Sequence, residues 1–293
     1  MKQTSLKKAK KFYMLFFITP AITVMLAVLI FPLFGAIYLS FNDFVGQKLV
    51  FAGFKNYLLS ISNEDVWNAL LINLKFTFFC VFFSFMLGLI LALLLNKIRF
   101  SRFFRLAFLM SWPTMSVVTG IIFAWIFNAQ FGVINEILVK SGILSSYIAW
   151  FGKIQTAFPI VISASVWKES PFYMIMILAG MKAIPEVQYE AAKVDGANSF
   201  QLFRYITLPY LKDVIKITVM LQIIWRFREF DIIQIMTQGG PNKGTEVLSV
   251  LVYRYCFKYI RFGEGAAIAV LMTIISMFFT VVYLKLTTKG DQK

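Results

Sequence analysis

The chain has 293 residues, of which 59% are hydrophobic and 17% aromatic, and its formal net charge is +15. A soluble domain is usually about 45–50% apolar, so this excess favours burial in lipid over one globular core. There is no histidine, and neither Cys80 nor Cys256 has a CxxC neighbour, which leaves a zinc site, a redox site and soluble-type catalysis unsupported. The basic residues flank apolar runs, which argues against a nucleic-acid partner and for contact with anionic lipid.

Six apolar stretches are long enough to cross a bilayer as helices, because about 20 residues span about 30 Å of hydrocarbon. They are 12–41, 69–95, 106–127, 157–181, 213–236 and 265–286. The predicted fold class is therefore all-α, a polytopic membrane protein with one transmembrane domain over 12–286 between tails 1–11 and 287–293. The first stretch follows a lysine-rich tail like a secretory signal, but it is too long and lacks a cleavage site, so we expect an uncleaved anchor.

The distribution of basic residues predicts the orientation of the chain. Lysine and arginine are roughly twice as frequent in the segments that lie inside when both termini are cytoplasmic. The last outer loop, 237–264, fits this rule least well, since it carries four basic residues of its own. Its middle, Leu248 to Phe257, is apolar and aromatic, which predicts a segment that dips into the bilayer or lies at its interface.

The segment between the fourth and fifth stretches predicts two short cytoplasmic helices. Pro185 suits a first helical position, and Gly196 can adopt the left-handed conformation that ends a helix. Asn198 or Ser199 can cap a second short helix, which Pro209 is expected to end. The residues alone leave two interpretations equally open: a surface that another protein approaches closely, and an amphipathic helix resting on the membrane.

This segment also carries a motif with fixed spacing, EAA-x3-G-x9-I-x-LP, formed by Glu190, Ala191, Ala192, Gly196, Ile206, Leu208 and Pro209. It resembles the EAA signature of permease subunits of binding-protein-dependent ABC importers, and Asp195-Gly196-Ala197 strengthens the match. Further stretches are similar to the carbohydrate-uptake branch, of sugar and glycerol-phosphate type: Ile18-Thr19-Pro20, Phe230-Asp231, Gly239-Gly240-Pro241, Thr245 and Tyr253.

The resemblance implies a type I ABC importer permease fold and an indirect role for ATP. The EAA loop would be a coupling helix seated in a cleft of a cytoplasmic ATPase, through Glu190, Ala191, Ala192, Asp195, Gly196, Ile206 and Pro209. The implied partners are a second homologous permease, two ATPase subunits and an extracytoplasmic solute-binding protein, in a prokaryotic cell membrane. The chain lacks a Walker pattern, so we expect no catalysis and no bound cofactor here, with ATP and Mg²⁺ on the partner ATPase.

Groups of neighbouring ionisable residues lie inside two of the predicted spans, where each such residue costs about 2.5–3.5 kcal/mol and usually marks a polar pathway. The fifth stretch contains Gln222, Trp225, Arg226, Arg228, Glu229 and Asp231, and the fourth contains Trp167, Lys168 and Glu169. Spacing of i, i+3 predicts that Arg226 pairs with Glu229 and Arg228 with Asp231. A structural or gating role is slightly favoured over lining of a translocation path, and both stay open. Pro171 predicts a kinked or broken fourth helix.

The predicted function is the permease subunit of an ATP-driven importer for a sugar, oligosaccharide, polyol or glycerol phosphate. An alternative from another class is an ion-coupled secondary transporter, with Glu229 and Asp231 as its proton or sodium sites. A third class, an integral-membrane enzyme, would need a nucleophile or metal constellation that the sequence does not offer.

Overall fold

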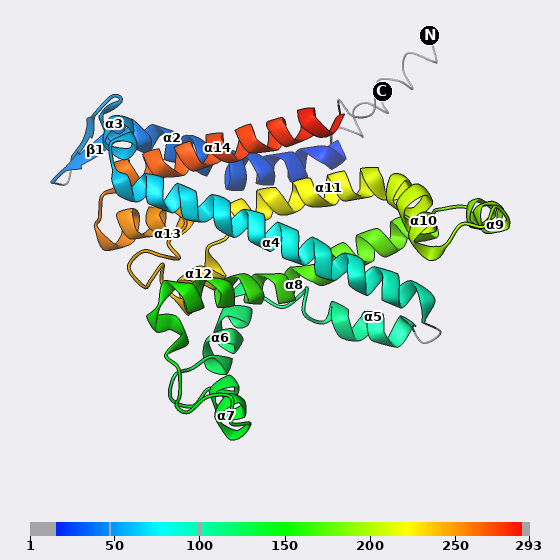
Figure 1. Ribbon diagram of the computed structural model, residues 1–293. Helices are drawn as coiled ribbons and strands as arrows, with labels where there is room; N and C mark the ends of the chain where they lie inside the picture. Colours follow the sequence, from blue (N-terminus) through cyan, green and yellow to red (C-terminus); the bar gives the residue numbers. More distant parts are fainter. Residues whose placement is uncertain (1–15, 47, 99–100, 289–293) are drawn as a thin grey trace, which may run out of the picture. The chain divides into compact units, whose positions relative to one another are not determined.

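Helices make up most of the computed structural model, which describes residues 16–46, 48–98 and 101–288 (Figure 1). The predicted tail 1–11 and residues 289–293 lie outside the described part. Contacts between Cα atoms divide the chain into two compact units, one built from 1–63 with 252–271 and the other from 64–251 with 272–293.

The first unit joins an apolar helix to a small polar hairpin–helix motif. The helix covers Phe16–Ser40, with a π segment η1 (Leu26–Ile30) leading into α2 (Phe31–Ser40). A hairpin of β1 (Asn42–Val45) and β2 (Lys48–Phe51) follows, and then α3 (Lys55–Ile61). The hairpin was not anticipated from the sequence, because two four-residue strands are too short for a clear alternating pattern.

A buried asparagine holds this hairpin–helix motif together. The Nδ2 atom of Asn56 donates to the carbonyl oxygens of Ser40, at 3.1 Å, and Asn42, at 2.9 Å. Gly263 lies so close that a Cβ atom there would sit 2.3 Å from the Asn42 oxygen and 2.6 Å from Asn56 Nδ2. Only glycine permits this approach of the last helix to the hairpin–helix motif.

The second unit is a bundle of helices. Its elements are α4 (Glu64–Lys97), α5 (Ser101–Leu109), α6 (Ser116–Ile126), α7 (Val133–Lys140), η2 (Trp150–Gly152), α8 (Ile154–Lys182), α9 (Glu186–Val194), α10 (Ser199–Leu202), η3 (Phe203–Thr207), α11 (Leu208–Phe227) and α12 (Asp231–Met236). The next helix, α13 (Leu248–Tyr253), begins in this unit and ends in the first. A π segment η4 (Arg254–Lys258) follows α13, and α14 (Phe262–Thr288) runs from the first unit into the second.

The centre of the bundle is the contact of α4 with α8. A Cβ atom on Gly88 would lie 2.4 Å from the Cβ of Tyr173 and 2.8 Å from the Ser170 oxygen, so the two backbones meet with no side chain between them. Around this crossing, Tyr173, Met174 and Ile177 are fully buried. The close approach explains why α4 and α8 form the frame on which the other helices pack.

Two predicted spans are interrupted. The stretch 106–127 forms α5 and α6 with a break over 110–115, where Pro113 removes a backbone donor and restricts the residue before it. The stretch 213–236 is likewise divided between α11 and α12. The expectation of one continuous helix in each stretch is wrong.

Two prolines have the opposite outcome, since helices continue through them. Pro209 does not end the second short helix: Leu208 N–H donates to Phe203 O in the π turn η3, and Pro209 enters α11 in its first turn, where a missing N–H costs little. Nor does Pro171 break α8, which is continuous over Ile154–Lys182.

The outer segment around Leu248 to Phe257 forms α13 and η4. Leu248, Val250 and Leu251 are buried against the protein itself. Three helices in the described part are long and apolar enough to cross a membrane by length and composition: Phe16–Ser40, Glu64–Asn96 and Phe262–Leu286. The mostly helical architecture is confirmed, whereas the side of the membrane on which the termini lie stays a prediction.

Candidate functional site

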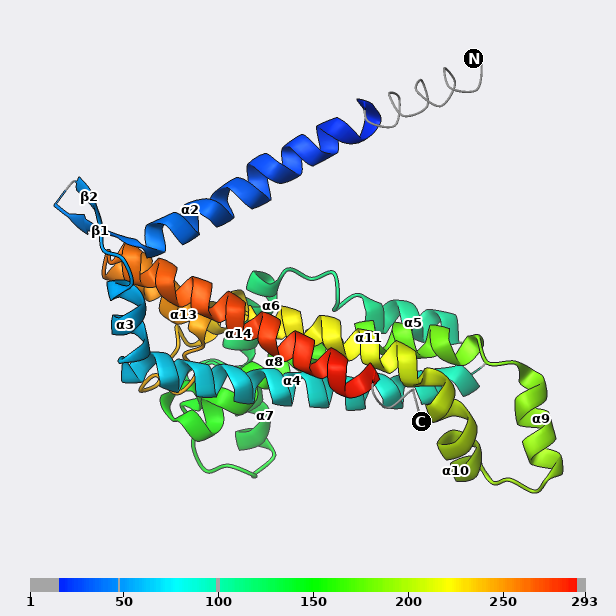
Figure 2. The same cartoon turned by 90° about the horizontal axis from the view of Figure 1, so that it is seen from above.

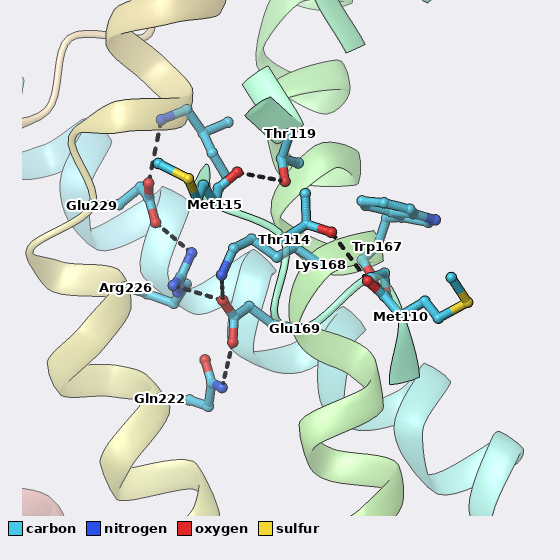
Figure 3. Close-up of polar contacts among 12 residues, drawn as sticks. Met110, Thr114, Met115, Thr119, Trp167, Lys168, Glu169, Gln222, Arg226 and Glu229 are labelled. Atoms are coloured by element: carbon cyan, nitrogen blue, oxygen red, sulfur yellow. Dashed lines mark hydrogen bonds and ion pairs between the residues drawn. The ribbon is translucent and has the colours of Figure 1, made fainter. Parts of the chain in front are cut away.

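Five of the predicted path or gate residues meet between α8 and α11 (Figure 3). Glu169 is the centre of this charged cluster: one carboxylate oxygen accepts from Lys168 Nζ at 3.0 Å and Arg226 Nη2 at 3.1 Å, and the other from Gln222 Nε2 at 3.0 Å. Arg226 Nη1 donates to Glu229, whose second oxygen accepts from the Ile232 backbone at 3.3 Å. The cluster thus ties α8, α11 and the start of α12 together.

Because the cluster is buried, each of its charged side chains is stable there only while its partners are present. Glu169 is 2% exposed, Gln222 1%, and Arg226 and Glu229 6% each. Two cations and two anions leave no formal net charge, which is the condition under which buried ions are tolerated. One atom, Arg226 Nε, has no hydrogen-bond partner in the described part of the chain.

The bond from Ile232 N–H to Glu229 compensates in part for the interruption of the fifth stretch. The first backbone N–H groups of a helix have no partner inside it, and the Glu229 carboxylate satisfies one of them at the start of α12. The chain between α11 and α12 is therefore a capped joint. Glu229, three residues before Ile232, is a signal in the sequence for a helix that begins near this position.

The second predicted charge pair does not form. Among the described residues, no ion pair joins Arg228 to Asp231, because α11 ends at Phe227 and the i, i+3 geometry that would bring the two side chains together is lost. Asp231 instead occupies the first turn of α12, where its negative charge is favourable beside the helix dipole.

Two predicted tryptophans lie at the margin of the charged cluster and are partly exposed, Trp167 at 41% and Trp225 at 40%. Trp225 packs on Phe172 with ring centroids 5.3 Å apart, and Phe172 stacks on Trp112 at 5.5 Å. This aromatic row, Trp112, Phe172 and Trp225, crosses from the break after α5 to α8 and α11. Its first two members were missed in the sequence.

The break after α5 is held against α8 by a hydrogen bond. Ser111 Oγ donates to the Trp167 carbonyl oxygen at 3.1 Å, as well as to Phe108 O at 3.0 Å. The dipeptide Trp112-Pro113 inside an apolar stretch was the available signal, because a proline there predicts a free carbonyl and an irregular backbone near an aromatic side chain.

The segment that carries α9 lies at the far end of the bundle and projects beyond α4 and α8 in both views (Figure 2). Pro185 is the N-cap residue of α9 with an extended backbone, one position before the first helical position predicted for it, whereas Gly196 at the end of the helix has φ +82°, as predicted. Asn198 caps α10 in a reciprocal capping box with Gln201. The predicted turn at Gly196 and the predicted cap at Asn198 are confirmed.

The EAA motif is divided between two elements. Glu190, Ala191 and Ala192 lie on α9 and Asp195 follows it, with none of the four buried, whereas Ile206 and Pro209 belong to η3 and α11. The two parts are joined by a hydrogen bond of 2.9 Å between the hydroxyls of Tyr189 and Thr207. Of the motif, Glu190, Ala191 and Ala192 therefore lie on the projecting helix α9.

One face of α9 is apolar and open. Val187 is 68% exposed and Val194 87%, and no residue of the helix is buried. An amphipathic helix ordinarily buries its apolar face, so this one lacks a partner within the described chain.

A family of known proteins accounts for the helical bundle and the projecting helix α9. The profile described as "Binding-protein-dependent transport system inner membrane component" matches residues 84–289. The chain belongs to this family. The permease is 35% identical over 283 residues to the trehalose/maltose transport system permease protein MalF of Thermococcus litoralis, covering 95% of this chain and 94% of that protein.

Other comparisons agree. The permease is 35% identical over 283 residues to the sulfoquinovosyl glycerol transport system permease protein SmoG of Agrobacterium fabrum, covering 94% and 90% of the two chains. Its fold matches a chain of a bacterial ABC transporter involved in the import of the acidic polysaccharide alginate, with a TM-score of 0.84, 22% identity and coverage of 98% and 99%. The predicted type I importer permease fold and the inner-membrane location are confirmed, and the ion-coupled alternative loses its support.

Proposed function

We propose that this permease forms, with a second homologous permease, the translocation path of an ATP-driven importer for a carbohydrate-type solute. The substrate class is supported by the relatives, whose names refer to trehalose or maltose and to sulfoquinovosyl glycerol. An extracytoplasmic binding protein delivers the solute, and two separate ATPase subunits bind ATP and Mg²⁺.

The observation that carries the coupling role is the open apolar face of α9 on the projecting loop. A helix with Val187 and Val194 exposed gains free energy by covering them, and the small side chains of Ala191 and Ala192 allow a partner's backbone to approach closely. Glu190, Asp195 and Gly196 fix the polar rim and the turn. Closure of the ATPases moves α9, and η3 transmits the motion through Ile206 and Pro209 to α11.

Co-purification tests this role. The double variant Val187→Asp/Val194→Asp places charge on the open face without disturbing a buried residue, so the permease stays folded but loses the ATPase. Ile143→Asp is the matched control, because Ile143 is 70% exposed and lies in the predicted outer segment after α7. An ATPase retained equally by both variants would count against α9 as the contact.

The charged cluster has a positioning role in this proposal. Glu169, Gln222, Arg226, Glu229 and Lys168 hold α8 against α11, so the two helices move as one gate.

The partly exposed Trp167 and Trp225 line the path, where aromatic faces can pack against sugar rings and the adjoining Arg228 and Asp231 can contact hydroxyl groups. Replacing Trp225 with Ala is expected to lower uptake into proteoliposomes while the ATPase stays bound.

The energy source can be tested in the same proteoliposomes. Uptake is expected to require ATP inside, the ATPases and the binding protein, and to be absent with a proton or sodium gradient alone. Uptake driven by the gradient alone would instead revive Glu229 and Asp231 as ion sites.

A further inference from the structure

The side of α9 opposite to its apolar face is polar and lines a cleft. Glu186, Tyr189 and Lys193 follow one another at three- and four-residue spacing, so they share a face of the helix. The cleft has a volume of about 530 Å³ and lies between α9, the ends of α4 and α8, and the α10–η3 segment. The helix therefore presents two surfaces of different chemistry.

The cleft is lined by both apolar and charged side chains. Five of its side chains are apolar: Leu93, Leu94, Met181, Leu202 and Phe203. The others are polar: Asn96, Glu186, Tyr189, Lys193, Ser199 and Thr207. Glu186 and Lys193 form no ion pair within the described part of the chain, although they carry opposite charges. Seven residues apart, they stand roughly 10 Å from each other along the helix axis.

The height of the cleft in the bilayer follows from the length of α4. Its 34 residues make a helix of about 51 Å, which exceeds the roughly 30 Å hydrocarbon core and leaves about 10 Å at each end. Leu93, Leu94 and Asn96 lie in the last turns of α4, in the end that extends beyond the hydrocarbon when the helix is centred in the bilayer.

We propose that this cleft binds the head group of an aminophospholipid, of the phosphatidylethanolamine type. Lys193 binds the phosphate, Glu186 accepts hydrogen bonds from the primary ammonium, and the first methylene groups of the acyl chains lie on Leu93 and Leu94. The phosphate and the ammonium are joined by the short ethanolamine tether, and the flexible side chains of Lys193 and Glu186 reach them with charge-assisted hydrogen bonds of about 2.7–2.9 Å. An anionic lipid without an amine would leave Glu186 facing negative charge.

The lipid site deepens the proposed function. Lipid binding itself does not depend on the role of α9, but its effect on coupling rests on α9 being the coupling helix. A head group in the cleft lies between α9 and the ends of α4 and α8. It supports α9 from behind while the ATPase contacts the apolar face in front. The lipid thus holds α9 in position for its contact with the ATPase, and its binding can be measured without measuring transport.

Lipid retention tests the site. The assembled importer is reconstituted into nanodiscs of equal parts phosphatidylethanolamine, phosphatidylcholine and phosphatidylglycerol, extracted in mild detergent, and its bound lipid is identified by native mass spectrometry. Phosphatidylethanolamine should be enriched on wild type, and Lys193→Gln or Glu186→Gln should lower its retention about tenfold, as expected for one lost charged hydrogen bond. Size-exclusion chromatography verifies that each variant is folded.

Two matched variants remove the same charges elsewhere. Lys140→Gln and Glu136→Gln on α7 break an exposed pair and should leave lipid retention unchanged. Equal retention of phosphatidylcholine, a preference for phosphatidylglycerol, or wild-type retention by both cleft variants would each overturn the lipid site. A permease that retains phosphatidylethanolamine but never binds an ATPase would overturn the coupling proposal alone.

Discussion

The charged cluster between α8 and α11 and the loop that carries α9 are opposites in construction. In the cluster, Glu169 is 2% exposed and its two carboxylate oxygens accept hydrogen bonds from three side chains. On α9, Val194 is 87% exposed and no residue is buried. Completeness of contacts marks a part that moves as a rigid body, and missing contacts mark a surface that another molecule completes.

The largest effect should come from breaking the cluster. Glu169→Gln removes one of its two anions, so Lys168 loses its carboxylate partner and Arg226 keeps only Glu229. An uncompensated buried charge costs about 3–5 kcal/mol, so the temperature at which the detergent-solubilised permease loses monodispersity should fall steeply. Glu136→Gln, on an exposed pair, should leave that temperature unchanged. Equal losses in the two variants would mean that burial does not govern the cluster.

A second variant tests whether the frame beneath the cluster is as tight as its contacts indicate. In Gly88→Ala the new Cβ would lie 2.4 Å from the Cβ of Tyr173, which forces α4 away from α8. Overpacking of this kind costs about 1–3 kcal/mol. Gly35→Ala is the control, because its Cβ would meet nothing within 4 Å and alanine favours a helix. A stable Gly88→Ala with unchanged uptake would show that the crossing is loose.

Sequence and structure agree where local chemistry decides. The turn at Gly196, the cap at Asn198 and the pair Arg226–Glu229 each depend on residues within a few positions, and each was predicted. The salt bridge from Arg226 to Glu169 joins residues far apart in the chain, so no periodicity indicates it. Likewise, whether Pro113 or Pro171 interrupts a helix depends on the neighbours that satisfy the freed backbone groups.

Gly196 allows the loop side of the comparison to be tested. Gly196→Ala places a Cβ at φ +82° with nothing within 4 Å, so the cost is backbone strain of about 1–2 kcal/mol and no clash. Because the projecting loop is not part of the buried core, global stability should hold while protease cleavage between α9 and α10 accelerates. Gly142→Ala, at φ +74°, is the matched control and should affect only the segment after α7. Global unfolding of Gly196→Ala would contradict the separation of loop and core.

The smallest effect concerns an ion pair that resembles the cluster in chemistry but is exposed. Lys243 Nζ lies 2.6 Å from both carboxylate oxygens of Asp65, yet the two side chains are 44% and 36% exposed. Water screens such a pair, so Asp65→Asn should cost only about 0.2–1 kcal/mol, and salt should reduce even that. Melting temperatures of wild type and Asp65→Asn in low salt and in high salt test this directly. A difference that persists in high salt, or one as large as that of Glu169→Gln, would show that geometry outweighs burial in this permease.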